Sequence, residues 1–265
     1  MPELPDVEVF RRYLEATALH KRIESVQDLE TGLLDGVSAN DLRRAIEEHA
    51  LEETARHGKH LLARIPGDGW LALHFGMTGR LKYHKLADSA PEHVCMRLAL
   101  ENGYDLDYAC TRKLGRIGLA ASPDALAREQ GLGPDALDPG LSGSGFARLL
   151  AGRRGMLKTA LMDQSLLAGI GNVYSDEILF QLSLHPRTPV DTLDEAGLKR
   201  LHATLRQVLE QAVENGADPA RMPDTMLTAH RHRDGCCPKC SGKLETIKVS
   251  GRSAVFCPAC QKTGS

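Results

Sequence analysis

The sequence predicts an α+β protein, with a β-sandwich or barrel in the N-terminal half, helices in the C-terminal half and a small cysteine-rich module at the end. Short apolar runs separated by Gly, Pro, Asn and Asp fill residues 21–120, a pattern typical of strands. Apolar residues at helical spacing dominate residues 145–215. Five of the seven cysteines lie within residues 236–260, which marks a separate module.

The N-terminal half is predicted to open with a helix over residues 6–20, because apolar residues recur there at helical spacing and Pro5 suits a helix start. Residues 39–50 form a helical insertion among the strands. Several short strands with turn residues between them favour a sandwich or barrel. The predicted strands cover residues 21–27, 60–65, 70–76, 80–86, 96–102, 104–109 and 116–122.

The stretch 121–147 is rich in Gly, Pro and Ser, and we interpret it as the linker between domains. Helices are predicted after it, and Gly216 ends the longest of them. Residues 217–235 are expected to be irregular. The predicted helices cover residues 145–151, 156–163, 172–183 and 194–215. The predicted domains are a sandwich domain at 1–122, a linker at 123–144, a helical domain at 145–235 and the cysteine-rich module at 236–265.

Charge is unevenly distributed along the chain. The net charge is −2, but residues 1–147 carry 17 Lys and Arg against 23 Asp and Glu, whereas residues 148–265 carry 16 against 12. A polyanionic partner would therefore bind mainly through the C-terminal half, although ordinary solvated surface explains the same pattern. No apolar run approaches the ~18 residues of a membrane span, and no signal peptide is visible. We expect a protein of the bacterial cytoplasm or nucleoid.

The C-terminal module carries two CxxC pairs, Cys237/Cys240 and Cys257/Cys260, separated by sixteen residues. This arrangement is a strong zinc signature, and four thiolates leave no open coordination position, so a single structural Zn²⁺ is predicted. A pair of redox dithiols is the alternative. The intervening residues have the length and alternation of a β-hairpin that turns near Ser250, with Arg252 at its tip. A basic tip favours contact with a nucleic-acid backbone over a purely structural cap.

The chain begins Met-Pro-Glu, and the initiator methionine is usually removed before a small residue such as Pro2. Removal would expose a secondary amine, and an α-amino group with a pKa of ~7.7–8.0 is a nucleophile near neutral pH. Attack on an acetal-like or carbonyl carbon would yield an iminium ion, which is a strong electron sink. Glu3 beside it could move protons. A processing context for Pro2 and a solvated charge at Glu3 are the simpler alternatives.

Five motifs in order resemble the formamidopyrimidine-DNA glycosylase/endonuclease VIII family. They are PELPDVE at 2–8, RHGKHLL at 56–62, HFGMTGRL at 74–81, LMDQSLLAGIGNVYSDEILF at 161–180 and GRSAVFCPACQ at 251–261. The opening PELP and Met77 favour the formamidopyrimidine branch. The resemblance implies an N-terminal β-sandwich, a helix–two-turn–helix domain with a zinc-finger β-hairpin, and damaged double-stranded DNA as the partner.

The resemblance also implies residue roles. Pro2 would attack C1′ of the damaged nucleoside, Glu3 would act as acid and base at the sugar, and Lys59 would assist base loss and β-elimination. Arg252 would grip a phosphate and assist δ-elimination, and Asn172 would hold a phosphate with help from Lys158. Glu177 matches a buried family position near the site.

Met77 would enter the space left by the everted nucleotide, with Arg112 at the orphaned base and His93 against DNA. Without the resemblance, a core methionine and a strand-edge lysine would be the simpler readings of Met77 and Lys59.

The chain also departs from the family pattern. The loop that usually reads Asp-Pro-Arg-Arg-Phe-Gly is here residues 110–115, Cys-Thr-Arg-Lys-Leu-Gly, so Leu114 replaces an aromatic and puts opposite-base preference in doubt. Asp6 replaces a usual Glu. The stretch 217–235 is short for a loop that covers an extruded 8-oxoguanine, and Arg231 and Arg233 make it basic.

The predicted function is therefore a bifunctional DNA glycosylase and abasic-site lyase that removes oxidised or ring-opened bases, purines above all, by β,δ-elimination. It would act as a monomer without a nucleotide cofactor. The alternative is a non-catalytic damaged-DNA or nucleic-acid binding protein on the same scaffold, which does not require Pro2, Glu3 and Lys59 together. A zinc-stabilised RNA-binding or ribosome-associated factor is a third possibility, disfavoured by the acidic N-terminal half.

Overall fold

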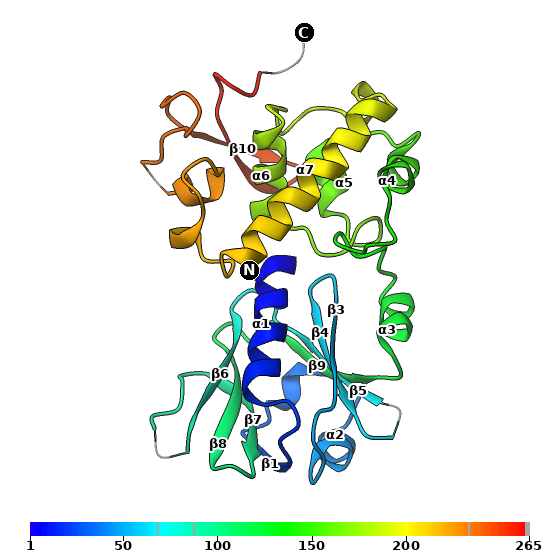
Figure 1. Cartoon of the computed structure of the whole chain (residues 1–265), viewed down its shortest axis with the longest axis vertical. Coiled ribbons are helices and arrows are strands. Elements are labelled where there is room, and N and C mark those ends of the chain that lie inside the picture. The colour runs from blue at the N-terminus through cyan, green and yellow to red at the C-terminus, as the bar shows by residue number, and fades with distance from the viewer. Residues whose placement is uncertain (68, 87, 233, 263–265) are drawn as a thin grey trace. The chain divides into compact units, whose positions relative to one another are not determined.

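The computed structural model describes residues 1–67, 69–86, 88–232 and 234–262 (Figure 1). The chain forms two compact units, Met1–Gln130 and Gly131–Ser265, which are described separately below. In the described part of the chain, every helix is too short or too polar to cross a bilayer. The α+β class expected from the sequence is confirmed, with sheets in the first unit and helices in the second.

The first unit contains two sheets built from the nine strands described in it. The four-stranded sheet has the order β1-β7-β8-β6, and the five-stranded sheet has the order β2-β9-β5-β4-β3. All their pairs are antiparallel except β2 with β9. The strands are β1 (Ile23–Gln27), β2 (Leu34–Asp35), β3 (Thr54–His57), β4 (His60–Ile65), β5 (Gly69–His74), β6 (Gly79–Lys85), β7 (Val94–Leu100), β8 (Tyr104–Cys110) and β9 (Arg116–Ala120).

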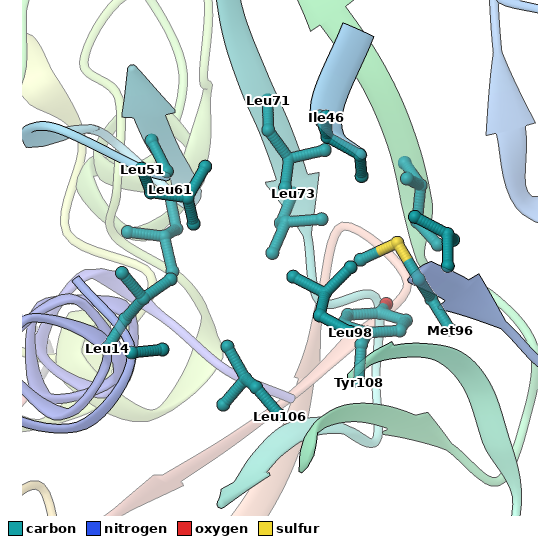
Figure 2. Close-up of a cluster of buried hydrophobic side chains, with 14 of the residues drawn as sticks. Leu14, Ile46, Leu51, Leu61, Leu71, Leu73, Met96, Leu98, Leu106 and Tyr108 are labelled. Atoms are coloured by element: carbon teal, nitrogen blue, oxygen red, sulfur yellow. The ribbon is translucent and has the colours of Figure 1, made fainter. Parts of the chain in front are cut away.

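The core of this unit lies between the two sheets, as the sandwich prediction requires. Figure 2 shows Leu61 and Leu73 of one sheet facing Leu98 and Leu106 of the other, and all four side chains are almost completely buried. Helix α1 (Leu4–Thr17) adds Leu14 to this core and packs against β3, β4 and β6. It therefore covers the side of the sandwich where the edge strands β3 and β6 lie. The other helices of this unit are α2 (Ala39–Ile46) and α3 (Pro123–Glu129).

The second unit is built around helix α6 (Asn172–Gln181), which packs against α5, α7, the 3-10 helix Leu227–His230 and strand β11. Seven consecutive residues, Tyr174–Phe180, are buried, so this helix has no solvent face over that length. Helix α7 presents an apolar stripe to α4 and α6. The remaining elements are α4 (Gly143–Leu150), α5 (Leu157–Met162), α7 (Glu195–Glu214), β10 (Glu245–Val249) and β11 (Arg252–Phe256), with 3-10 helices at Val190–Thr192 and Pro219–Arg221.

The structure differs from the sequence prediction in the linker and at two strands. Residues 123–129, expected within the linker 123–144, form helix α3 of the first unit, because the Ser122 hydroxyl accepts a hydrogen bond from the Ala125 amide at 3.0 Å and Pro123 fits the first helical turn. Strands β2 and β3 were not expected. Residues 217–235, expected to be irregular, contain two 3-10 helices, and Arg233 lies outside the described residues.

The close packing of Gly115 against Tyr108 predicts a specific loss of stability. A Cβ at Gly115 would lie 1.7 Å from the Tyr108 hydroxyl and 2.9 Å from the His74 carbonyl oxygen, so Gly115→Ala should lower the unfolding free energy by about 1–3 kcal/mol. Gly69→Ala is the control, because a Cβ there meets nothing within 4 Å. Thermal unfolding would measure both variants. Equal melting temperatures for the two would contradict this packing.

Candidate active site and nucleic-acid interface

The amino-terminal turn buries two carboxylates next to Pro2. Helix α1 begins at Leu4 with Glu3 as its N-cap, and the Glu3 backbone amide donates to Asp6 Oδ2 at 2.8 Å. Glu3 is 1% exposed, whereas Pro2 is half-buried. Burial raises the pKa of Asp6 to about 6, and the nearby Glu3 charge also raises it. An amine at Pro2 would thus have a buried carboxyl group, Glu3, as its immediate neighbour in the chain.

Lys59 is the second residue of the two-residue turn between β3 and β4, whose first residue, Gly58, adopts a left-handed φ of +56°. Its charge acts on His74, whose pKa burial lowers to about 4 with further lowering by Lys59 and Arg116. His74 is paired across the sheet with His60, whose pKa burial and neighbouring histidines lower to about 3. Both rings are therefore neutral at pH 7. Sequence reasoning did not single out this pair; the available signal was a histidine at the end of an otherwise apolar strand.

Met77 and Arg112 lie on two loops that form one surface. The Thr78 hydroxyl accepts the Arg112 amide at 3.0 Å, and a Cβ at Gly76 would lie 2.4 Å from the backbone of Leu114, so the loops are in direct contact. Met77 is 40% exposed and Leu114 is 51% exposed, and only two other large apolar side chains among the described residues are exposed, Met1 and Leu86. A core position for Met77 is therefore wrong. The surface combines two protruding apolar side chains with an exposed arginine.

His93 is connected to this surface by a backbone hydrogen bond. Its carbonyl oxygen accepts the amide of Cys110, the last residue of β8 before the loop that carries Arg112. The residue has a left-handed φ of +62°, and its side chain is 49% exposed. In the first unit, therefore, the structure groups His93, Met77 and Arg112 at adjoining loops.

In the second unit, Lys158 and Asn172 meet at the start of helix α6. Lys158 Nζ donates to the Asn172 carbonyl oxygen at 3.3 Å and to Ser175 Oγ at 2.9 Å, and it pairs with Asp176 Oδ1 at 2.6 Å. The Lys158 side chain is 1% exposed, so its charge lies inside the fold. Asn172 Oδ1 is buried and has no hydrogen-bond partner among the described residues.

Two buried carboxylates on α6 bind the segments around it. Asp176 Oδ2 accepts the Val255 amide of β11 at 3.0 Å and also pairs with Arg231. Glu177, the next residue, accepts the amides of Leu227 and Thr228 at 3.1 and 2.6 Å. Both carboxylates are fully buried, and these bonds compensate the cost of burying their charge. The short segment 217–235 is thereby attached to α6.

The zinc prediction is supported by geometry. Sγ atoms of Cys237 and Cys260 are 3.9 Å apart, those of Cys240 and Cys257 are 3.5 Å apart, and all four lie within 4.8 Å of one another. A ZnS₄ tetrahedron with bonds of ~2.3 Å requires S–S distances of roughly 3.8 Å, so the four thiolates fit one Zn²⁺. Cys236 does not belong to this cluster.

The hairpin carries Arg252 on a tight turn. Val249 pairs with Arg252, so the turn is Ser250-Gly251, and φ values of +46° and +80° are those of a type I′ hairpin. Ser250 Oγ and the Thr159 hydroxyl are 3.1 Å apart, which seats the turn on α5. Lys158 and the exposed Arg252 line a hollow of about 250 Å³ beside this contact.

A second hollow shares Thr159, Asp163 and Ser250 with the first and is lined by Arg153 and Arg154. The two hollows therefore adjoin each other at the turn of the hairpin. Arg153 pairs with Asp163 at 3.5 Å, and both arginines are exposed. Sequence reasoning missed them; the signal was an arginine pair between two glycines, Gly152 and Gly155, immediately before α5.

Comparison with protein families covers most of the chain. Residues 1–117 match the formamidopyrimidine-DNA glycosylase N-terminal domain, and residues 132–224 match the formamidopyrimidine-DNA glycosylase H2TH domain. Residues 237–263 match a zinc finger found in FPG and IleRS. The three matches follow the order of the sandwich, the helical region and the cysteine-rich module.

Curated relatives match over nearly the full length. The formamidopyrimidine-DNA glycosylases of Desulfitobacterium hafniense and Moorella thermoacetica are each 34% identical to this chain. Each alignment covers 98% of this chain, with 100% and 92% of the respective relatives.

Solved structures are similar in fold. Lactococcus lactis formamidopyrimidine-DNA glycosylase bound non-covalently to DNA with an abasic site gives a TM-score of 0.87 at 26% identity, covering 98% of this chain and 100% of that one. MutM in complex with DNA containing carbocyclic 8-oxo-G gives 0.87 at 27% identity, covering 99% and 100%.

The cluster of four cysteines predicts the effect of removing one zinc ligand. Cys237→Ser should abolish zinc binding and lower the melting temperature, because Cys237 is buried with Phe180 and Leu227 and the module is too small for a core of its own. Elemental analysis would give the zinc content. Cys236→Ser is the matched control and should retain the metal. Unchanged zinc in Cys237→Ser would show that the ligand set is wrong.

Proposed function

The chain belongs to the formamidopyrimidine-DNA glycosylase family, and from this premise we propose that it excises damaged bases through a Pro2 Schiff base and then cleaves the DNA strand. This proposal rests mainly on the arrangement of residues around the start of helix α1. This helix begins two residues after Pro2, Glu3 is buried at its cap, and Arg56 connects the turn that contains Lys59 to Glu8 of the same helix. A nucleophile, a carboxylate and a lysine therefore come from one connected part of the first unit.

The glycosylase step follows from these groups. The neutral Pro2 amine forms a bond to C1′ while the bond from C1′ to the damaged base breaks, and the base leaves with a proton. Glu3 transfers protons at the sugar as its ring opens, which leaves an iminium ion between Pro2 and C1′. Burial of Glu3 holds the carboxylate at a fixed place beside the amine, and such positioning accounts for much of an enzyme's rate.

The lyase steps use the iminium ion as an electron sink. Loss of a C2′ proton expels the 3′ phosphate by β-elimination, and Lys59 assists this step. A further elimination expels the 5′ phosphate, and Arg252 stabilises the departing anion. Strand cleavage then leaves a gap of one nucleoside. Zinc holds the hairpin that carries Arg252 and takes no part in the chemistry.

The DNA partner fits the charge distribution of the second unit. Asn172, with help from Lys158, and Arg252 would bind phosphates near the everted nucleotide, and Arg153 and Arg154 would extend this contact along the backbone. Residues 148–265 carry a net positive charge, and phosphate contacts depend mainly on such charge. Lys158 acts through the Asn172 backbone, because its ammonium group is buried.

The protruding surface of the first unit fits nucleotide eversion. C1′ is inaccessible inside a duplex, so the nucleotide must be turned out at a cost of a few kcal/mol. Met77 would fill the vacated space and Arg112 would contact the orphaned base, with His93 on the adjoining backbone. Apolar wedges of this kind hold base steps apart in other DNA complexes.

Oxidised or ring-opened purines are the proposed lesions. The solved relatives bind DNA containing an abasic site, carbocyclic 8-oxo-G or Fapy-dG. Leu114 offers less stacking surface than an aromatic residue, so discrimination of the opposite base would depend mainly on Arg112. We propose that the enzyme acts as a monomer in the bacterial cytoplasm, without a nucleotide cofactor.

Borohydride trapping tests the Schiff base directly. Incubation with DNA containing an abasic site or 8-oxoguanine, followed by borohydride, should give a covalent adduct, because hydride reduces the iminium ion to a stable amine. Pro2→Gly should give little or none at equal DNA binding. Binding without any adduct in the unsubstituted protein would favour a non-catalytic damage-binding protein. Mass spectrometry of the mature chain would show whether Met1 is removed.

Arg252→Ala should separate the two elimination steps. Base release and β-elimination should persist, whereas δ-elimination should fall by roughly 10²-fold, as when one anion-stabilising group is removed. Product analysis on a denaturing gel distinguishes the 3′ ends left by the two steps. An equal fall in base release and δ-elimination would contradict this division of roles.

A further inference from the structure

A largely buried ion pair connects helix α1 to the turn that contains Lys59. Arg56 Nε lies 3.2 Å from Glu8 Oε2, with side chains 9% and 12% exposed. The same guanidinium donates from Nη1 to the Gly58 carbonyl oxygen at 3.3 Å. Arg56 thus bonds to the second turn of α1 and to the residue adjoining Lys59.

Glu8 is held by α1 itself before it meets Arg56. Arg11 donates to both of its carboxylate oxygens at 3.0 and 2.8 Å, and Arg12 Nε donates to Oε1 at 3.0 Å. Burial alone would raise the pKa of Glu8, but the hydrogen bonds and charges of Arg11, Arg12 and Arg56 lower it to about 2. The carboxylate is therefore charged and fixed in place at neutral pH. Its position is determined by the helix.

We propose that Glu8 and Arg56 are positioning residues, which set Lys59 relative to Pro2 and Glu3 for the reaction proposed above. Lysine has a flexible side chain, so the place of its ammonium group depends on where the backbone of its turn is held. Gly58 adopts a left-handed φ of +56°, which defines the turn, and Arg56 fixes its carbonyl oxygen against α1. A misplacement of about 1 Å can cost ~10²-fold in rate.

Arg12 provides a matched control for Arg56. Both arginines donate to the Glu8 carboxylate, but Arg12 is 57% exposed and, in the described part of the chain, makes no bond to the turn that contains Lys59. Arg56→Gln and Arg12→Gln each remove one cationic partner of Glu8. A purely electrostatic or stabilising role would make the two variants similar once their stabilities are matched. A positioning role predicts that only Arg56→Gln lowers the reaction rate.

The measurement is single-turnover strand cleavage and borohydride trapping on DNA with a preformed abasic site, at saturating protein. Arg56→Gln should slow both by at least about tenfold with unchanged affinity for DNA containing a stable abasic analogue, and Arg12→Gln should stay within about twofold. Arg56→Lys keeps the charge beside Glu8 and should fold, yet it lacks the guanidinium fork that bonds Glu8 and Gly58 together, so it should also be slow.

The outcomes separate a failure of the positioning role from a failure of the proposed function. Rates within about twofold of the unsubstituted protein for folded Arg56→Gln or Arg56→Lys would overturn the positioning role. A loss of DNA affinity with an unchanged reaction rate would also overturn it. Equal losses of reaction rate in Arg56→Gln and Arg12→Gln would overturn it as well. Absence of an adduct with the unsubstituted protein would overturn the proposed function instead, and the positioning role with it.

Discussion

The second unit depends on a carboxylate that has no access to water. Asp176 lies on a helix buried on all sides, where an isolated charge would be very costly. Its partners come from α5, from the segment after α7 and from β11, namely Lys158, Arg231 and the Val255 amide. Satisfying one buried charge therefore brings three distant stretches of the chain to the same place. Removing any one of these partners would leave the buried carboxylate with fewer bonds to compensate the cost of its burial.

Glu8 has a comparable role in the first unit, although it is less buried. It connects α1 to an edge strand and to the turn that contains Lys59 through Arg56. In both units the acidic residue lies on a helix and its partners include a basic residue outside that helix. The groups proposed to react are thus held by ionic contacts and by the apolar cores beneath them.

Much of the fold was predictable because its signals are local. Apolar runs marked most strands, and two CxxC pairs marked the zinc site before any geometry was known. Strand β3 was missed because Thr54–His57 is half-buried throughout and shows no alternation; its pairing with β4 and packing against α1 define it. The helix α3 was missed although Ser122 and Pro123 carry its start signal. The His60–His74 pair and the burial of Lys158 arise from register and tertiary contacts, which no short window of sequence contains.

The zinc hairpin is fastened at both of its ends. Lys239 donates to the Phe180 and Gln181 carbonyls at the end of α6, Gln261 donates to the Leu184 carbonyl, and the turn rests on Thr159 through Ser250. The two-stranded hairpin is therefore attached to the rest of the unit both at its cysteine end and at its turn. The backbone that carries Arg252 is therefore held in place before any ligand arrives. The entropic cost of ordering this backbone when a phosphate binds would be correspondingly small, and the place of Arg252 as well as its charge would then contribute to recognition.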